Sequence, residues 1–170
     1  LASVEIFRED EAGRFHPTEL SDCLGDRPGS QYAVALLMAD EHYASWGELL
    51  YSVQTGKPAF DHIHGKPVFD WLSGLPERAK VFDAAMTGFH GNETQAMIDA
   101  YDFAGLRTVV DVGGGNGTVI SAILKSNPAV QGVLYDLPGV IERSRASLER
   151  GGLAERCRTI AGSFFESAPP

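Results

Sequence analysis

The 170-residue sequence has few cysteines, few basic side chains and no long hydrophobic run. Its two cysteines, Cys23 and Cys157, lie far apart, which argues against a disulfide framework and favours a reducing, cytoplasmic setting. No apolar run approaches the roughly 20 residues that span a bilayer, so we expect no association with a membrane. The chain starts at Leu1 without a signal peptide, and we interpret both of its ends as cut from a longer protein.

The 14 basic side chains are outnumbered by 23 acidic ones, which leaves a formal net charge of −9. A protein that binds nucleic acid or anionic lipid by bulk electrostatics needs clustered lysine and arginine, so this balance argues against both partners. A hydrophobic share of 44% is ordinary for a globular protein. At roughly 100–200 residues per domain, the length holds one full domain or two small or incomplete ones.

The N-terminal part combines a hairpin pattern with a helical pattern. Residues 4–20 contain two short β-prone stretches around a polar tip with Gly13, which predicts a β-hairpin. A lone hairpin is marginally stable in water, so we interpret residues 1–27 as the end of a small domain. After a breaker cluster at residues 26–30, apolar residues recur at helical spacing up to Gly56, which predicts one long helix or two in succession.

Residues 28–104 are predicted to form a helical linker. Glycines and prolines recur over residues 55–76, which predicts a broken connecting stretch there. One further helix is expected from Pro76, and a second is expected at the capping pattern Asn92 to Gln95.

From Arg107 onward, apolar β-branched runs alternate with helical stretches. Three strands are predicted at residues 107–112, 132–136 and 158–162, and we expect the first to be buried on both faces. A strand–helix–strand–helix–strand order with short turns is typical of one half of an open, doubly wound parallel sheet with right-handed crossovers. The predicted fold class is therefore α/β, with residues 105–170 as a partial Rossmann-like domain.

The ends of these strands carry the residues that indicate a ligand site, because open parallel sheets bind ligands outside the carboxyl ends of their strands. Asp111 ends the first strand and is followed by a glycine-rich turn. Gly113 and Gly115 in this turn permit backbone angles that other residues avoid, and they leave room for a ligand to approach.

The second and third strands end in residues that suit a nucleoside. Asp136 ends the second strand, where its carboxylate can accept two hydrogen bonds from a ribose diol. Ser163 and Phe164 follow the third strand, where a small polar group and an aromatic ring would frame a flat adenine. Together the three strand ends predict a nucleoside site.

The glycine spacing distinguishes between nucleoside cofactors. A dinucleotide site has the pattern G-x-G-x-x-G, whereas here the glycines fall as G-x-G-x-G and Thr118 stands at the third dinucleotide position. The carboxylate of Asp111 would also repel a diphosphate. S-adenosylmethionine carries an ammonium, a sulfonium and a ribose diol, which complement Asp111 and Asp136. The glycine spacing therefore disfavours a dehydrogenase, and only binding of a nicotinamide cofactor would support that alternative.

Two segments, Thr108–Gly117 and Tyr135–Ile141, resemble the class I S-adenosylmethionine-dependent O-methyltransferases that act on small phenolic and polyketide natural products. The N-terminal hairpin resembles the wing of that family's winged-helix dimerisation domain, and Trp46–Leu49 and Tyr101–Phe103 resemble its interdomain helices. The resemblance implies that a homodimer transfers a methyl group from S-adenosylmethionine to a hydroxyl of a small aromatic or polyketide-type metabolite.

Carried over residue by residue, the resemblance implies that Gly113 lies near the methionine part of the cofactor. It also implies that Asp136 binds the ribose hydroxyls, with Leu137 beside it in the site. Ser163 and Phe164 would lie near the adenine, and the family usually has an acidic residue where Ser163 stands. This departure weakens the expected contact with the adenine amino group.

The resemblance places Met86 near the methyl donor or acceptor, whereas its helical spacing with Phe82 favours a core position. The family's general base is a histidine expected beyond Pro170, so we assign no catalytic residue within this chain. We also predict no metal site. A loop His-x-His at His62 and His64 with a distant third histidine lacks the converging geometry that ligation needs.

An alternative from another class is a winged-helix and Rossmann-like protein that binds a ligand without catalysis. The hairpin and the unusual Ser163 motivate this alternative, and the acidic composition argues against contact with DNA. A purely structural alternative also exists, in which Asp111 and Asp136 only shape a tight turn and cap a helix.

Overall fold

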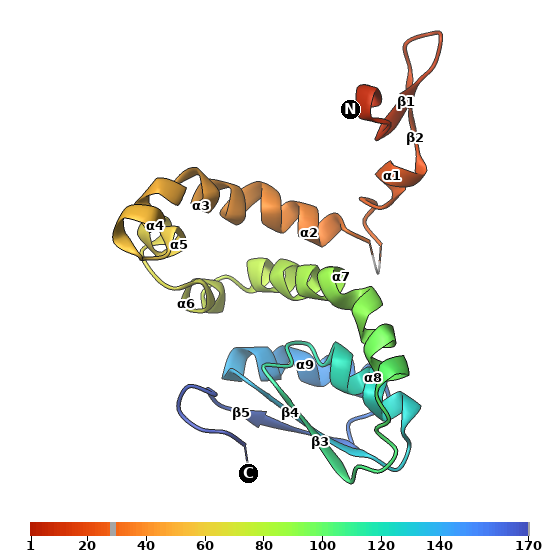
Figure 1. Cartoon of the computed structure of the whole chain (residues 1–170), viewed down its shortest axis with the longest axis vertical. Coiled ribbons are helices and arrows are strands. Elements are labelled where there is room, and N and C mark those ends of the chain that lie inside the picture. Colours follow the sequence, from red (N-terminus) through yellow and green to blue (C-terminus); the bar gives the residue numbers. More distant parts are fainter. Residues whose placement is uncertain (28–29, 170) are drawn as a thin grey trace. The chain divides into compact units, whose positions relative to one another are not determined.

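The computed structural model describes residues 1–27 and 30–169 and divides into two compact units, Leu1–Phe89 and His90–Pro170 (Figure 1). Each unit is described separately below. Within the described residues, no helix is long and apolar enough to cross a membrane.

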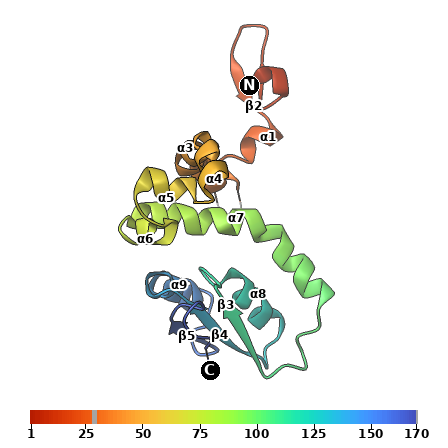
Figure 2. The same cartoon turned by 60° about the vertical axis from the view of Figure 1, so that its left-hand side comes forward.

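The first unit begins with the predicted hairpin. After a 3₁₀ turn at Ala2–Val4, strands β1 (Phe7–Glu9) and β2 (Phe15–Pro17) pair antiparallel (Figure 2). The Asp10 carboxylate organises the tip: it accepts hydrogen bonds from two backbone amides and from the side chains of Arg14 and His16. Helix α1 (Glu19–Asp22) follows, capped by Thr18.

A nearly continuous helical segment follows the hairpin, as the spacing predicts. It consists of α2 (Tyr32–Leu37), a π-helical turn η2 (Met38–His42), α3 (Tyr43–Gly47) and α4 (Leu49–Thr55). The path is interrupted at Glu48, which leaves the helical backbone region. Part of the predicted breaker cluster, residues 28–29, lies outside the described residues.

The prediction of a broken connecting stretch over residues 55–76 is wrong, because two short helices occupy it: α5 (Ala59–His64) and α6 (Val68–Ser73). The glycines and prolines mark the helix ends. Gly56 and Gly65 adopt left-handed φ angles of 69° and 75° just after α4 and α5, and a proline precedes each of α5 and α6. Glycine and proline are common at the ends of helices, so their recurrence is compatible with short helices between them.

The prediction of two helices after residue 76 is also wrong, because a single helix α7 runs from Pro76 to Ala100. A glycine inside a helix costs only about 1 kcal/mol relative to alanine, which a long helix tolerates. Gly88 moreover permits close packing, since a Cβ there would lie 3.2 Å from both the Ser30 carbonyl oxygen and Val34 Cγ2. The side chain of Asn92, the expected cap, lies outside the described residues.

The second unit has the predicted parallel α/β order. Strands β3 (Thr108–Val112), β4 (Gln131–Asp136) and β5 (Cys157–Ala161) form a sheet in the order β3-β4-β5, and helices α8 (Thr118–Ser126) and α9 (Pro138–Arg150) connect them (Figure 1). The core combines residues of both helices with the sheet and the loops beside it: Ile120, Leu124, Val130, Leu134, Ile141, Leu148, Leu153 and Cys157.

The expectation that the first strand is buried on both faces is wrong. Val109 packs against the core, but Val110 and Val112 remain 42% and 50% exposed. Among the described residues, β3 pairs only with β4 and is an edge strand. The central strand β4 does show the continuous burial expected of a parallel strand, from Gly132 to Tyr135.

Candidate functional site

The glycine-rich turn after β3 adopts the special backbone that its composition predicts. Gly113, Gly115 and Gly117 have φ angles of 72°, 58° and 79°, a region that other residues adopt only with strain. The amide of Gly113 donates a hydrogen bond to the Tyr135 carbonyl at 2.8 Å, so the turn starts directly where the pairing of β3 with β4 ends.

Gly114 is required for a different reason, namely the absence of a side chain. A Cβ at this position would overlap Leu134 Cδ1 and lie 2.5 Å from Cγ of Asp111. The turn therefore packs directly on the core strand β4 and on the carboxylate that ends β3. Sequence reasoning did not single out Gly114, because the contact depends on how β4 lies beside the turn.

Gly114→Ala is expected to destabilise the protein by about 1–2 kcal/mol, within the usual cost of overpacking a filled space. The added methyl group must push aside Leu134 or Asp111. Urea unfolding followed by circular dichroism measures the effect. Gly139→Ala is the matched control, since its Cβ would meet only the end of the Arg143 side chain, at 3.7 Å. Equal stability of the two variants would contradict the packing described.

Asp111 places a buried, unpartnered oxygen beside this turn. Within the described residues, Oδ2 of Asp111 has no hydrogen-bond partner. Burial raises the pKa of the Asp111 carboxyl, a hydrogen bond from the Ile120 amide opposes this rise, and the charge of Asp136 adds to it. Buried acceptors without partners are rare in folded proteins, and perturbed carboxyl groups gather at functional sites. Asp111 is thus suited to receive a cationic group from a ligand.

Asp136 holds the same turn from the end of β4. Its Oδ2 accepts a hydrogen bond from the Gly115 amide at 2.8 Å, and its Oδ1 accepts one from the Leu137 amide at 2.7 Å. A carboxylate offers about four acceptor positions, so two remain for a ligand. Asp136 therefore does stabilise the turn, as the structural alternative expects, and its carboxylate can still accept hydrogen bonds from hydroxyl groups of a ligand.

The third strand end also reaches the turn. Phe164 is 55% exposed, and its Cε1 atom lies 3.6 Å from the position that a Cβ of Gly113 would take. Ser163 is engaged in its own turn, because its hydroxyl accepts a hydrogen bond from the Phe165 amide at 3.3 Å and its carbonyl accepts from the amides of Glu166 and Ser167.

The structure therefore brings together most of the residues predicted for the site, all in the second unit: Asp111, Gly113, Gly115, Asp136, Leu137 and Phe164. Ser163 lies next to Phe164 in the chain, with its hydroxyl used locally. Met86 lies on α7 in the first unit, where it is half-buried.

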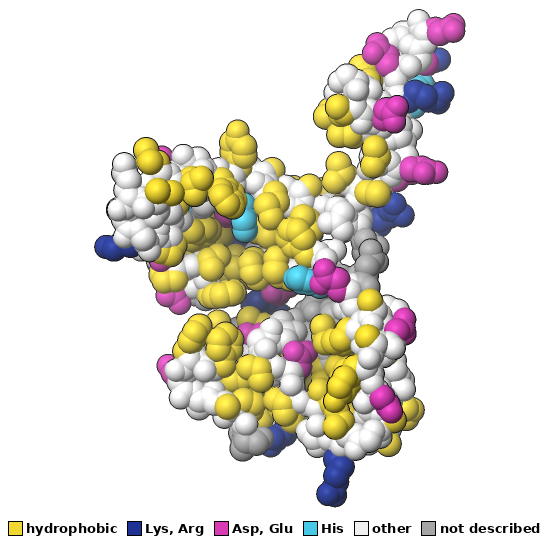
Figure 3. All heavy atoms as spheres, viewed as in Figure 1, with side chains coloured by type: hydrophobic (Ala, Val, Ile, Leu, Met, Phe, Trp, Pro, Cys, Tyr) yellow, Lys and Arg dark blue, Asp and Glu magenta, His cyan; other side chains and the backbone are white. Residues whose placement is uncertain are grey.

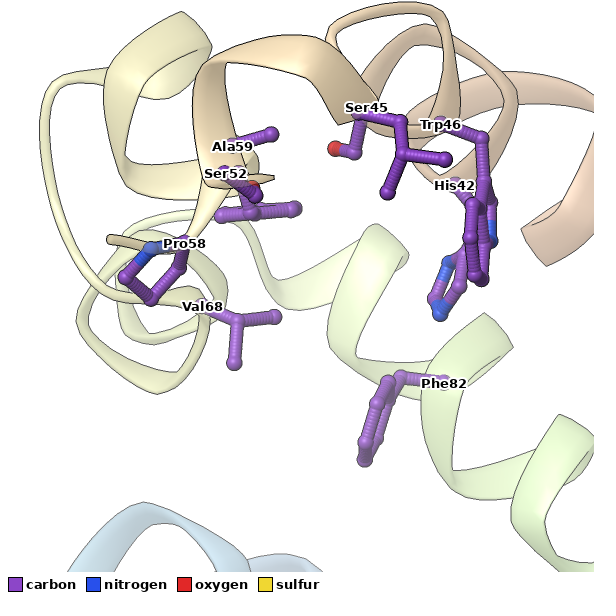
Figure 4. Close-up of a pocket in the computed structure, with 10 residues that line it drawn as sticks. His42, Ser45, Trp46, Ser52, Pro58, Ala59, Val68 and Phe82 are labelled. Carbon is purple, nitrogen blue, oxygen red and sulfur yellow. The ribbon is translucent and has the colours of Figure 1, made fainter. Parts of the chain in front are cut away.

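The first unit contains a pocket that sequence reasoning missed (Figure 4). Its volume is about 360 Å³, and its lining includes His42, Trp46, Phe60, Val68 and Phe82. These residues come from separate helices, whereas spacing along a single helix predicts only that its own apolar residues share one face. No signal in the sequence marks His42 as facing a cavity.

An open parallel sheet with a glycine-rich turn and two carboxylates at the carboxyl ends of its strands is the arrangement of a Rossmann-like domain. Residues 46–170 match the model of a family described as an O-methyltransferase domain, and this match covers more than half of the chain. The chain therefore belongs to that O-methyltransferase family.

Curated relatives that are similar to the chain include an O-methyltransferase and a protein named as a hydroxylase. The chain is 38% identical to a phenazine O-methyltransferase of Lysobacter antibioticus, with 99% of this chain and 50% of that protein covered. It is 36% identical to an aclacinomycin 10-hydroxylase of Streptomyces purpurascens, with 95% and 44% covered.

A solved O-methyltransferase from neocarzinostatin biosynthesis, in complex with S-adenosyl-L-homocysteine and 1,4-dihydroxy-2-naphthoic acid, is 29% identical with a TM-score of 0.83. The alignment covers 99% of this chain and 52% of that one. The chain thus spans about half the length of the relatives it matches. The α/β fold expected from the sequence is confirmed.

Proposed function

We propose that this chain contributes the cofactor site of an S-adenosylmethionine-dependent O-methyltransferase that acts on a hydroxyl of a small aromatic or polyketide-type metabolite. The observation that carries the proposal is the buried, unpartnered Oδ2 of Asp111 beside the glycine turn. Membership of the O-methyltransferase family and the solved relative with S-adenosylhomocysteine support it.

The residues present fit the chemical groups of this cofactor. Asp111 offers a buried carboxylate to the ammonium group, and its environment is less favourable for a negative charge than water, so a neighbouring cation would stabilise it. The two acceptor positions left on Asp136 suit a ribose diol. Phe164 offers an exposed aromatic face for the adenine, next to Gly113.

When bound, S-adenosylmethionine supplies a methyl group on a cationic sulfonium. The residues of this chain would bind and orient it. Alignment of two reacting groups contributes about 7–11 kcal/mol in favourable cases, so positioning is the main task of such a site. Removal of the hydroxyl proton needs a general base, and we place that base outside this chain.

The names of the relatives support a flat aromatic acceptor, since they include a phenazine and a naphthoic acid ligand. A second candidate function is ligand binding without methyl transfer. The observation behind this candidate is that a relative at 36% identity is named a hydroxylase and not a methyltransferase, so similarity to this family does not by itself ensure methyl transfer.

Methyl transfer is tested with the full-length protein, methyl-labelled S-adenosylmethionine and a panel of hydroxylated bicyclic and tricyclic aromatics. We expect a labelled methyl ether and S-adenosylhomocysteine in equal amounts for at least one acceptor. The matched control panel carries methoxy groups in place of the hydroxyls and should accept no label. Cofactor binding without transfer to any acceptor would favour the second candidate.

The proposal includes a homodimer in the cytoplasm. Exposed apolar side chains gather over α3 and α4 (Figure 3), among them Tyr43, Leu50 and Val53 at 77%, 66% and 73% exposure, and such a patch suits a protein partner. Cys23 and Cys157 are both unpaired, which suits a reducing compartment. Sedimentation equilibrium of the full-length protein tests the dimer.

A further inference from the structure

We infer that Tyr135 is a positioning residue for the adenine end of the cofactor: its buried hydroxyl anchors the loop of residues 163–167, which carries Phe164. The inference rests on the proposed function, because it takes the molecule that Phe164 contacts to be S-adenosylmethionine. All the residues involved lie in the second unit.

The loop of residues 163–167 follows β5, where the chain turns back (Figure 1). The Ser163 carbonyl accepts hydrogen bonds from the amides of Glu166 and Ser167, at 2.9 and 3.0 Å. These bonds close the loop on itself but do not attach it to the sheet. Residues 164–167 are all exposed, and a segment with few buried contacts opens at a small cost in free energy.

Hydrogen bonds to β4 attach the loop to the sheet on both sides of Phe164. Before the loop, the Gly162 amide donates to the Asp136 carbonyl at 2.9 Å. At the far end of the loop, the Tyr135 hydroxyl donates to the Ser167 carbonyl, also at 2.9 Å. Removal of the Tyr135 hydroxyl therefore leaves the loop attached by its first side alone.

The Tyr135 ring reaches the loop by passing against Gly162. A Cβ on Gly162 would lie 2.7 Å from Cε2 of Tyr135, so the ring occupies space that a side chain at this position would need. Tyr135 is 2% exposed, and a buried tyrosine hydroxyl usually has a hydrogen-bond partner. A phenylalanine would fill the same space, so the hydroxyl supplies a contact that packing alone does not require.

Tyr135 also contacts the glycine turn, through its backbone. Its carbonyl accepts a hydrogen bond from the Gly113 amide at 2.8 Å. Phe164 approaches the same glycine from the loop, since its Cε1 atom lies 3.6 Å from the position that a Cβ of Gly113 would take. One residue of the central strand thus holds the glycine turn by its backbone and the Phe164 loop by its side chain.

This anchoring sets the aromatic face of Phe164 beside the glycine turn before a ligand arrives. A loop that is already ordered costs less free energy to bind a ligand than one that binding must order. Without the hydroxyl, part of the binding energy would be spent on ordering the loop. The loss is limited to the value of about one hydrogen bond, which corresponds to an affinity reduced about three- to tenfold.

Tyr135→Phe in the full-length protein tests the inference, with the affinity for S-adenosylhomocysteine measured by calorimetry. We expect binding to weaken about three- to tenfold, because the substitution removes one hydrogen bond and keeps the ring. Tyr101→Phe is the matched control, since Tyr101 is 56% exposed in the same unit, and its affinity should equal that of the wild type. Urea unfolding establishes that each variant is folded under the conditions of the titration.

A double-mutant cycle with Phe164→Ala separates positioning from a general effect on stability. If the hydroxyl acts through Phe164, adding Tyr135→Phe to Phe164→Ala should weaken binding by less than about a further twofold. A merely structural role would lower the affinity by the same factor in both backgrounds, because independent effects add. Phe164→Leu serves in this cycle if Phe164→Ala binds too weakly to measure.

Hydrogen exchange of the free protein, followed by mass spectrometry, tests the anchor without a ligand. We expect residues 163–167 to be protected in the wild type and to exchange faster in Tyr135→Phe. Wild-type exchange as fast as that of an unstructured peptide would overturn the inference even if the variant does not fold.

The titrations distinguish this inference from the proposed function. Unchanged affinity in Tyr135→Phe, or equal weakening with and without Phe164, would overturn the inference and leave the proposed function standing. A wild-type protein that binds neither S-adenosylmethionine nor S-adenosylhomocysteine would overturn the proposed function and the inference with it.

Discussion

Asp111→Asn is expected to make the free protein more stable and, at the same time, to weaken S-adenosylmethionine binding by about ten- to a hundredfold. The stabilisation follows because burial disfavours the charged form of Asp111, and asparagine has no charge to desolvate. The loss of affinity follows because a charge-assisted contact to the ammonium group is removed, a contact of about 1.5–3 kcal/mol. Opposite signs in the two measurements are characteristic of a residue retained for binding.

The stability difference should depend on pH in a defined direction. Burial raises the pKa of the Asp111 carboxyl above its ordinary value, so the folded protein holds this proton more strongly than the unfolded chain does. Wild-type stability attributable to Asp111 therefore falls as the pH rises through this raised pKa. The advantage of Asp111→Asn should therefore be larger at pH 7 than at pH 4.

Urea unfolding at both pH values measures the stability difference, and calorimetry measures the affinity. Glu155→Gln is the control, because Glu155 is an exposed carboxylate in the same unit. If Asp111→Asn lowers stability at pH 7, or leaves cofactor affinity unchanged, Asp111 does not have the role given to it.

Asp136→Ala is expected to weaken cofactor binding by about 1–3 kcal/mol, the range for losing a charged hydrogen-bond acceptor. The variant removes the acceptors for the ribose hydroxyls and also the partners of the Gly115 and Leu137 amides. The glycine turn would thus lose one of the contacts that hold its shape.

Calorimetry with S-adenosylmethionine and S-adenosylhomocysteine measures this loss. Glu155→Ala controls for the change of charge, and Asp136→Asn separates the two effects because it keeps one acceptor oxygen. We expect Asp136→Asn to lie between the wild type and Asp136→Ala. An unchanged affinity in Asp136→Ala would remove Asp136 from the site.

Most of the second unit was predictable because its signals are local. The β-branched run before Gly113 predicts β3, Pro138 starts α9, and Asn127 and Pro128 follow the end of α8. The three strand ends converge because the carboxyl ends of parallel strands share one edge of a sheet. These relations follow from the order of residues alone.

The errors concern features that depend on the surroundings. Whether β3 is covered on both faces depends on which elements pack against it. A valine such as Val110 occurs in buried and in exposed strand positions, so its identity does not reveal this. The capping pattern Asn92 to Gln95 begins a new helix only where the chain leaves the helical path before it, and here α7 continues through it to Ala100. The unpartnered nitrogen of His42 arises from the meeting of separate helices, which spacing within one helix does not reveal.

Isothermal titration calorimetry of the full-length protein tests most directly whether the three strand ends form a site for S-adenosylmethionine. We predict that S-adenosylmethionine and S-adenosylhomocysteine each bind with one site per chain, and that NAD⁺ produces no binding heat. The absence of binding by both S-adenosyl compounds, or binding of NAD⁺ in their place, would contradict the roles assigned to Asp111 and Asp136.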